Sequence, residues 1–145
     1  MSQELVTAET SMNLTEWNSR LQQHFEELRR QRLAAAGDKP LFVLEHGLGA
    51  RDLQDLTTEI RSHIVASVPD DGHGLPWIVY AAELGYRYSG DEYWQTFEEE
   101  TPGWLARGDR YWIRRCFQRF HEQLGGAKPS GPWAEHFSII CWPIT

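Results

Sequence analysis

Seven tryptophans in a chain of 145 residues constrain its fold more than any other feature of the sequence. An indole ring buries a large apolar surface but keeps one N–H that needs a hydrogen-bond partner, so tryptophans usually lie in a core or an interface. A chain of this length can bury such rings in one domain without disulfides or metals. We therefore expect a single aromatic-rich domain. The tryptophans are Trp17, Trp77, Trp94, Trp104, Trp112, Trp133 and Trp142.

Composition and charge narrow the class of protein. The formal net charge of -7 argues against a dedicated nucleic-acid binder, because neutralising phosphates requires a basic surface. Cys116 and Cys141 lie in apolar segments, which predicts buried thiols rather than a secreted disulfide framework. The N-terminus lacks the pattern of a signal peptide, and no apolar run approaches the roughly 20 residues of a membrane-spanning helix. We expect a cytoplasmic protein with no membrane segment.

Hydrophobic spacing predicts a mainly α-helical fold, an irregular bundle of about six helices. Residues 1–12 are polar and predict a flexible tail, and residues 13–145 predict a single helical domain. The first helix begins after Asn13, which forms a capping box with Glu16, and ends before Gly37. Residues 40–44 form a short apolar run, for which we expect an extended connection. A second helix follows over residues 50–66.

The other four helices are predicted from proline, glycine and capping signals. Pro76 suits the first position of a third helix, and residues 77–84 are apolar on nearly every side, which predicts a central buried helix. A fourth helix follows the capping pair Ser89 and Glu92. Asp109 is the predicted N-cap of a fifth helix, which ends at residue 124. The sixth begins at residues 131–132 and ends before residue 143.

The apolar faces of these helices predict the core. On this basis the core residues are Trp17, Leu21, Phe25, Leu56, Ile60, Trp77, Tyr80, Trp94, Phe97, Ile113, Phe117, Phe120, Trp133, Phe137 and Ile140. Two tryptophans fall outside such faces and are therefore interface candidates. Trp104 follows Pro102 and Gly103 in a predicted loop, and Trp142 lies in an abrupt apolar end to the sequence. That end predicts continuation into a longer parent protein.

Five arginines between residues 107 and 120 are the strongest candidates for binding a partner. Helical rotation of about 100° per residue places Arg115 and Arg119 opposite the apolar stripe of the fifth helix, with Arg114 at its flank. Guanidinium groups on an exposed face bind phosphates or carboxylates, so nucleic acid and protein both remain open as partners. The alternative is an ordinary solvated face, with Arg119 paired to Glu122. The five candidates are Arg107, Arg110, Arg114, Arg115 and Arg119.

No recognised catalytic, cofactor or metal motif is found in the sequence, so we assign no catalytic residue, cofactor or metal. Cys116 and His121, like His136 and Cys141, are five residues apart, which does not place a helical pair on one face for zinc. The glutamates at 98–100 are expected to be solvated, with Arg107 or Arg110 as ion-pair partners.

One enzyme hypothesis remains open. Loop residues Glu45, His46, Asp71 and His73 could serve a small hydrolase or nuclease-like enzyme, but only if they converge in one pocket.

Two blocks of sequence resemble a known family. They are LPWIVYAAELGYRYSGDEYW at residues 75–94, which runs on to TPGW at 101–104, and WAEHFSIICWPIT at residues 133–145. Both are similar to the N-terminal part of the large accessory proteins of type III Druantia anti-phage defence systems, and the resemblance covers residues 14–145. It implies a role in bacterial antiviral defence, with the rest of the parent chain and a helicase-like defence protein as partners. It includes no catalytic motif.

These observations lead to one expected function and one other alternative. We expect a helical protein-interaction or scaffolding domain of a defence protein. The other alternative is a DNA-contacting module that uses the arginine-rich helix. Because the chain is acidic, protein contacts are favoured over DNA contacts.

Overall fold

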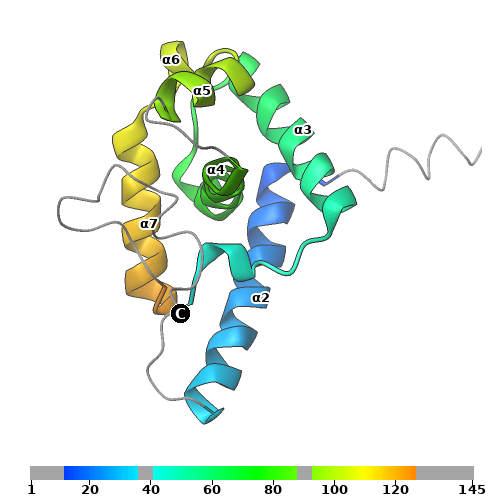
Figure 1. Ribbon diagram of the computed structural model, residues 1–145, viewed down its shortest axis with the longest axis vertical. Helices are drawn as coiled ribbons and strands as arrows, with labels where there is room; N and C mark the ends of the chain where they lie inside the picture. Colours follow the sequence, from blue (N-terminus) through cyan, green and yellow to red (C-terminus); the bar gives the residue numbers. More distant parts are fainter. Residues whose placement is uncertain (1–11, 36–40, 88–92, 127–145) are drawn as a thin grey trace, which may run out of the picture.

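The protein is a mainly α-helical, irregular bundle, shown by a computed structural model that describes residues 12–35, 41–87 and 93–126. The described residues form six α-helices and two 3₁₀ turns in the order α2 (Leu14–Ala35), η1 (Val43–Glu45), α3 (Ala50–Ala66), η2 (Asp71–His73), α4 (Gly74–Arg87), α5 (Tyr93–Glu100), α6 (Trp104–Arg107) and α7 (Arg110–Leu124). Helix α4 runs through the middle, surrounded by α2, α3, α7 and the α5–α6 pair (Figure 1).

Helix α4 is central because its sequence is apolar on every side. Every residue from Leu75 to Ala82 is buried, as is Leu84, so this part of the helix has no solvated face. Such a helix is stable only when other elements surround it. The structure confirms the predicted central helix. It begins at Gly74 rather than Pro76, because η2 continues into it directly.

The aromatic rings form one cluster around Trp77. The indole of Trp77 lies 5.4 Å from that of Trp104, 6.0 Å from Trp112 and 6.5 Å from the ring of Phe97, measured between ring centroids. Tyr80 also contacts Phe97, at 5.4 Å. Stacked and edge-on geometries such as these add to the stabilisation that comes from area burial. The cluster joins α4, α5, α6 and α7 into one core.

The structure confirms the predicted core wherever it describes the side chains. All eleven of those residues are buried, and they are Trp17, Leu21, Phe25, Leu56, Ile60, Trp77, Tyr80, Phe97, Ile113, Phe117 and Phe120. The side chains of Trp94, Trp133, Phe137 and Ile140 lie outside the described part of the protein, as does the predicted sixth helix. Trp112, also predicted to be core, is buried at 6% exposure.

Helix ends follow the predicted caps. The Asn13 carboxamide oxygen accepts the Glu16 N–H at 2.8 Å, and the Glu16 carboxylate accepts the Asn13 N–H at 2.9 Å, which confirms the capping box. At α7, the Asp109 carboxylate accepts the Tyr111 N–H at 2.8 Å. Met12, which we assigned to the N-terminal tail, is partly buried and packs against the core.

The segment after residue 40 is more compact than expected. Leu41 forms a single parallel bridge with Gly126, in which its N–H donates to the Gly125 carbonyl at 3.3 Å. From Val43 the chain turns into η1 instead of continuing as an extended connection. The turn is stabilised by the Glu45 carboxylate, which accepts the Phe42 N–H at 2.9 Å.

Candidate interaction surface

The candidate arginines are positioned by the amphipathic helix α7. Ile113, Phe117 and Phe120 are buried against the core, and Arg115 is exposed on the other side, as the helical spacing predicted. The Arg114 guanidinium lies over the Tyr111 ring, 5.5 Å from its centroid. This geometry is a cation–π contact, which holds the tyrosine ring and the guanidinium together on the outer face of the helix.

Arg119 has a different partner from the one expected. Its guanidinium lies 3.3 Å from the Asp71 carboxylate and also approaches the Asp71 carbonyl at 3.4 Å. The predicted Arg119–Glu122 pair is therefore wrong, and Glu122 instead accepts a hydrogen bond from the Gln118 amide at 2.6 Å. The indole N–H of Trp112 also donates to Asp71, at 2.7 Å. These two bonds tie η2 to α7.

Arg107 lies on α6, beside the C-terminal end of α3. A Cβ at Gly103 would lie 3.7 Å from the Arg107 guanidinium and 3.3 Å from the Ile64 carbonyl, so this guanidinium is close to the end of α3. Arg107 and Arg115 have no carboxylate partner among the residues that the structure describes. The Arg110 side chain lies outside the described part. Two of the five candidates are thus exposed cations without an ion pair in the described structure.

Exposed apolar side chains lie on the same segments as these arginines. The four large hydrophobic residues exposed in the described ranges are Val65, Val68, Leu105 and Tyr111. They come from the last turn of α3 and the residues after it, from α6, and from the first turn of α7, all of which lie in the upper part of the molecule (Figure 1). We call Val65, Val68, Leu105, Arg107, Tyr111 and Arg115 the α3–α6–α7 end.

Most of this surface was not predicted from the sequence. Val65 is turned about 100° around the α3 axis from Ile64, the last residue of the buried stripe of that helix. A helical wheel could therefore have identified Val65 as an exposed apolar residue. Val68 would continue that stripe, but α3 ends at Ala66. Trp104, expected to be exposed, is buried, and the next residue, Leu105, is 78% exposed instead.

The assignment of Trp104 as an exposed interface residue was wrong. Trp104 begins α6 and is only 3% exposed, because its ring packs against Trp77 and Phe97. Gly103 makes this possible with a φ of 105°, a left-handed backbone conformation that turns the chain back toward the core. The other interface candidate, Trp142, lies outside the described residues.

The acidic run at residues 98–100 has structural roles. The Glu98 carboxylate accepts the Leu105 N–H at 2.5 Å and the Gly103 N–H at 3.4 Å, so it caps the start of α6. Glu100 pairs with Arg61 of α3 at 2.7 Å, rather than with Arg107, because the chain turns toward α3 after α5. The other expected partner, Arg110, has its side chain outside the described part.

Glu45 is held by bonds within the protein. Its carboxylate forms an ion pair with Arg32 and accepts the N–H of Phe42. Burial disfavours the charged carboxylate, but the guanidinium and the N–H outweigh burial and lower the pKa of Glu45 below its ordinary value. A carboxylate with a lowered pKa is a poor proton acceptor at neutral pH.

His46 is buried, and both of its ring nitrogens are occupied. Its Nδ1 accepts the Leu48 N–H at 2.9 Å, which requires Nδ1 to be unprotonated. Nε2 therefore carries the proton and donates to the Glu83 carboxylate at 2.6 Å. Neither nitrogen is left to exchange a proton with a substrate, so this histidine connects η1 to α4.

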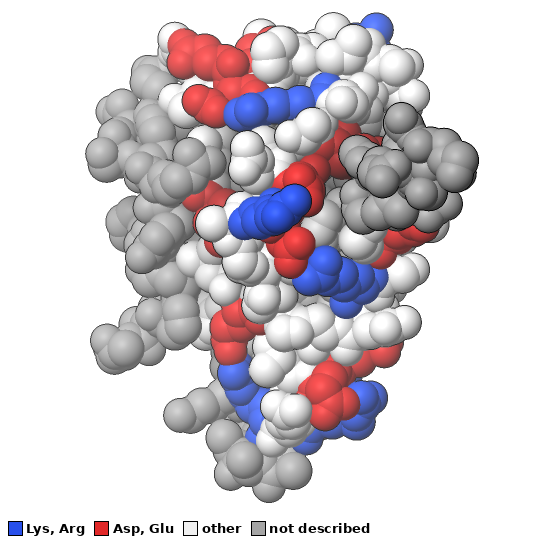
Figure 2. Space-filling model, turned by 90° about the vertical axis from the view of Figure 1, so that its right-hand side faces the viewer, with Lys and Arg blue, Asp and Glu red and all other residues white. Residues whose placement is uncertain are grey.

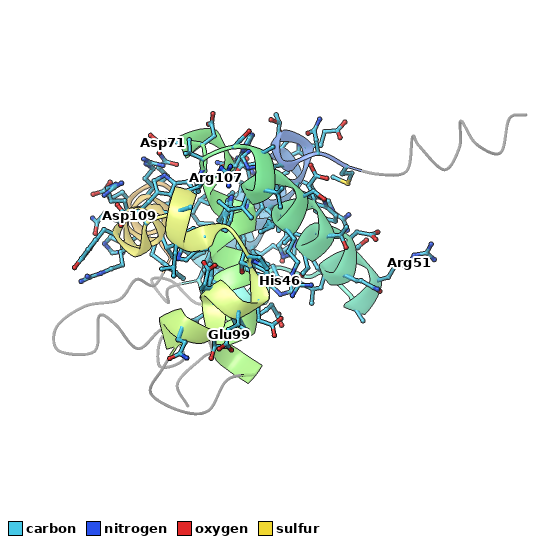
Figure 3. The ribbon with its side chains drawn as sticks, turned by 90° about the horizontal axis from the view of Figure 1, so that it is seen from above. His46, Arg51, Asp71, Glu99, Arg107 and Asp109 are labelled. Carbon is cyan, nitrogen blue, oxygen red and sulfur yellow. The ribbon has the colours of Figure 1, made fainter. Side chains whose placement is uncertain are left out.

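The remaining two residues of the enzyme hypothesis lie in a different part of the molecule. His73 and Glu45 contact different parts of α2. His73 Nε2 is bonded to the Thr15 hydroxyl at 2.9 Å, whereas the carbonyl of Glu45 is bonded to the His24 ring at 2.7 Å. Thr15 and His24 are nine residues apart in α2, about 14 Å along a helix. Figure 3 likewise shows Asp71 well separated from His46. The four residues do not converge in one pocket.

His73 forms a second local cluster with His63. Their rings meet edge to face with centroids 5.5 Å apart. The Nδ1 atoms of both rings are buried and have no hydrogen-bond partner within the described structure. Burial is the main cause that lowers the pKa of His63, and the nearby His73 lowers it further.

The other possible chemical groups are inert or dispersed. Cys116 is buried, as predicted, and burial raises the pKa of its thiol to about 12, which leaves almost no thiolate at neutral pH. Cys116 lines a hollow of about 70 Å³ together with Arg119 and Asn18, large enough for a few water molecules at most. Cys141 lies outside the described residues.

Two further observations concern metals and membranes. Across residues 12–35, 41–87 and 93–126, no three His, Cys, Asp or Glu side chains are grouped so that they could hold a metal ion. Within the same ranges, no helix combines the length and the apolar character that crossing a membrane requires.

Comparisons with known proteins give no relative. No protein-family model, curated protein or solved structure matches this chain. Its function must therefore be inferred from its own residues and their arrangement.

Proposed function

We propose that this chain is a protein-interaction and scaffolding domain of a bacterial anti-phage defence protein. Its proposed partners are the remainder of a larger parent chain and a helicase-like defence protein, and its proposed location is the cytoplasm. The defence role is supported by the sequence blocks at residues 75–104 and 133–145. The interaction role is supported by the surface of the fold.

The observation that carries the interaction role is the composition of the α3–α6–α7 end. Tyrosine and arginine are enriched in protein interfaces, where apolar contacts at the centre are surrounded by polar groups. Here Leu105 is 78% exposed and Tyr111 is 51% exposed, beside the arginines of α6 and α7. On the described part of the α3 side, acidic and basic side chains are interspersed (Figure 2).

The two alternatives have less support. An enzyme would need its acid, base and nucleophile within hydrogen-bonding reach of one another, and Glu45, His46 and His73 are instead bonded to separate structural partners. A DNA-contacting module is favoured only by the arginines. The chain as a whole carries a formal charge of -7, which opposes phosphate binding.

The experiment is a pull-down with the parent protein in two forms, one complete and one lacking residues 1–145. We expect recovery of the helicase-like partner to fall strongly when the domain is removed. The control is the removed domain supplied in trans, which should restore recovery or compete with the complete protein. Equal recovery with and without the domain would contradict the proposal.

A further inference from the structure

We infer that the α3–α6–α7 end docks an acidic segment of a partner protein, one that also places an aliphatic or aromatic side chain against Leu105 and Tyr111. This inference rests on the proposed interaction function and specifies the chemistry of the partner. It is carried by three features of the end, which are its apolar side chains, its exposed cations and its rigid support.

The exposed apolar side chains of this end come from three segments of the chain. Single exposed hydrophobic residues are common on protein surfaces and need no explanation. In the described ranges, however, all four large ones come from segments in the upper part of the bundle: Val65 at 62%, Val68 at 64%, Leu105 at 78% and Tyr111 at 51% exposure. A partner side chain that covers them would remove apolar area from water.

The aspartates at this end are already bonded within the protein. Asp109 accepts the Tyr111 N–H, and Asp70 accepts the Gly72 N–H at 2.7 Å. Asp71 accepts the indole N–H of Trp112 and pairs with Arg119. Asp71 also attracts Arg115 electrostatically and so offsets part of the charge of that arginine.

Arg107 and Arg115 supply the complementary charge for an acidic partner. Neither has a carboxylate partner among the described residues, and Arg115 is exposed. A guanidinium binds a carboxylate with two parallel hydrogen bonds, which fixes the orientation of the bound group. Figure 3 shows Arg107 on the same side of the molecule as Asp71 and Asp109, away from Arg51.

The same features favour a carboxylate-bearing protein over nucleic acid. Asp71 lies close to Arg115 and Arg119, and its charge would repel a chain of phosphates, whereas a protein segment can place single carboxylates at the arginines. Exposed valine and leucine side chains also match an apolar anchor better than a sugar–phosphate backbone.

The end is built on buried, fixed residues. Leu105 follows Trp104, whose ring is packed in the aromatic cluster. Tyr111 precedes Trp112, whose indole N–H is bonded to Asp71. Surface side chains next to such anchors need little ordering when a partner binds, and this lowers the entropic cost of association.

The test uses the 145-residue chain and three labelled probes in fluorescence anisotropy. The first probe is a helical peptide of about 16 residues with a glutamate-rich face and a leucine–tryptophan face. The second has glutamine in place of every glutamate, and the third is a DNA duplex of similar length. We expect the acidic peptide to bind most tightly and to weaken as salt is added.

Variants locate the binding. Arg115→Glu and Leu105→Asn should each weaken the acidic peptide by about tenfold, because each removes one part of the docking surface. Arg51→Glu is the matched control, with the same charge change on an exposed residue of α3, and should change the affinity by less than about twofold. Thermal unfolding checks that every variant folds, and Arg115→Gln removes the charge without introducing repulsion.

Three results would overturn the inference. They are equal affinity for the glutamate and glutamine peptides, equal loss in Arg51→Glu and Arg115→Glu, and DNA binding tighter than peptide binding with the same sensitivity to Arg115→Glu. Absence of peptide binding would also overturn it. If the pull-down still requires residues 1–145 in that case, the interaction function stands and only this mode of docking is wrong.

Discussion

Trp77 connects four helices through one side chain. Its ring contacts Trp104, Trp112 and Phe97, so three helices besides its own pack on one side chain. The sequence predicted that Trp77 is buried, because residues 77–84 are apolar on nearly every side. It did not predict these contacts, since they depend on how α5, α6 and α7 fold back over α4.

Replacing Trp77 should therefore be among the most damaging substitutions in this protein. We expect Trp77→Ala to lower the free energy of unfolding by about 3–5 kcal/mol, through lost burial and the cavity that remains. Trp77→Phe should cost clearly less, because an aromatic ring remains and the indole N–H has no hydrogen-bond partner in the described structure. Urea denaturation of the three proteins measures both effects. Equal losses for the two variants would contradict this expectation, because they would show that the phenyl ring of Trp77→Phe recovers none of the packing.

His63 should make stability depend on pH. Its pKa is lowered by burial and by His73, although Glu59 and Asp70 act in the opposite direction. As pH falls below about 6.5, the unfolded chain therefore takes up this proton before the folded protein does. The contribution of neutral His63 to the free energy of unfolding is fully present above about pH 6.5. It is lost progressively as the pH falls toward the lower pKa that His63 has in the folded protein.

The measurement is the unfolding temperature between pH 8 and pH 5 for the wild type and for His63→Gln. We expect the wild type to lose more stability than the variant over this range, because only the wild type has an imidazole at position 63. His121→Gln is the control, since His121 is exposed and lies on α7. Parallel pH profiles for wild type and His63→Gln would contradict this explanation.

At the scale of helices, the sequence predicted most of what the structure describes. The capping box at Asn13 and the N-cap at Asp109 place the starts of α2 and α7 where the structure has them. These boundaries are predictable because each cap is formed by residues within three positions of one another. Helix α6 was missed because its start depends on Gly103 and on a carboxylate from Glu98, seven residues before the Leu105 N–H.

The arginine partners could not be predicted for a related reason. Arg119 pairs with Asp71, 48 residues away in the sequence, and Arg61 pairs with Glu100, 39 residues away. Helical spacing gives the direction of a side chain and identifies partners only within one helix. Consequently the face that carries Arg115 was predicted correctly, whereas the pairing of Arg119 was not.

The linker between α6 and α7 requires glycine at position 108, because the Trp104 ring leaves no room there for a side chain. Gly108 has φ of −102° and ψ of 178°, which an alanine also adopts, but its Cβ would overlap the ring of Trp104. We expect Gly108→Ala to cost about 1–3 kcal/mol, typical of an overpacked core, with a change in tryptophan fluorescence.

Gly49→Ala is the matched control for this substitution. Nothing lies within 4 Å of a Cβ at Gly49, and its φ of −81° suits alanine, so the cost should stay below about 1 kcal/mol. Equal costs for the two variants, measured by chemical denaturation, would show that Trp104 does not pack against Gly108.

At the scale of the whole molecule, buried and exposed polar residues connect elements, and exposed apolar and basic groups lie at one end. His46 and Glu83 join η1 to α4, and Asp71 joins η2 to α7. The sequence suggested the arginines of this end, because they form a cluster along the chain. It did not suggest the apolar residues, since they come from three separate segments of the chain.

Hydrogen–deuterium exchange of this domain, alone and within the assembled parent complex, tests the central claim most directly. We predict that assembly slows amide exchange in residues 64–68 and 104–115 and leaves α2 unchanged, because the partner covers the α3–α6–α7 end. Slower exchange confined to α2, or no change at residues 64–68 and 104–115, would contradict the account.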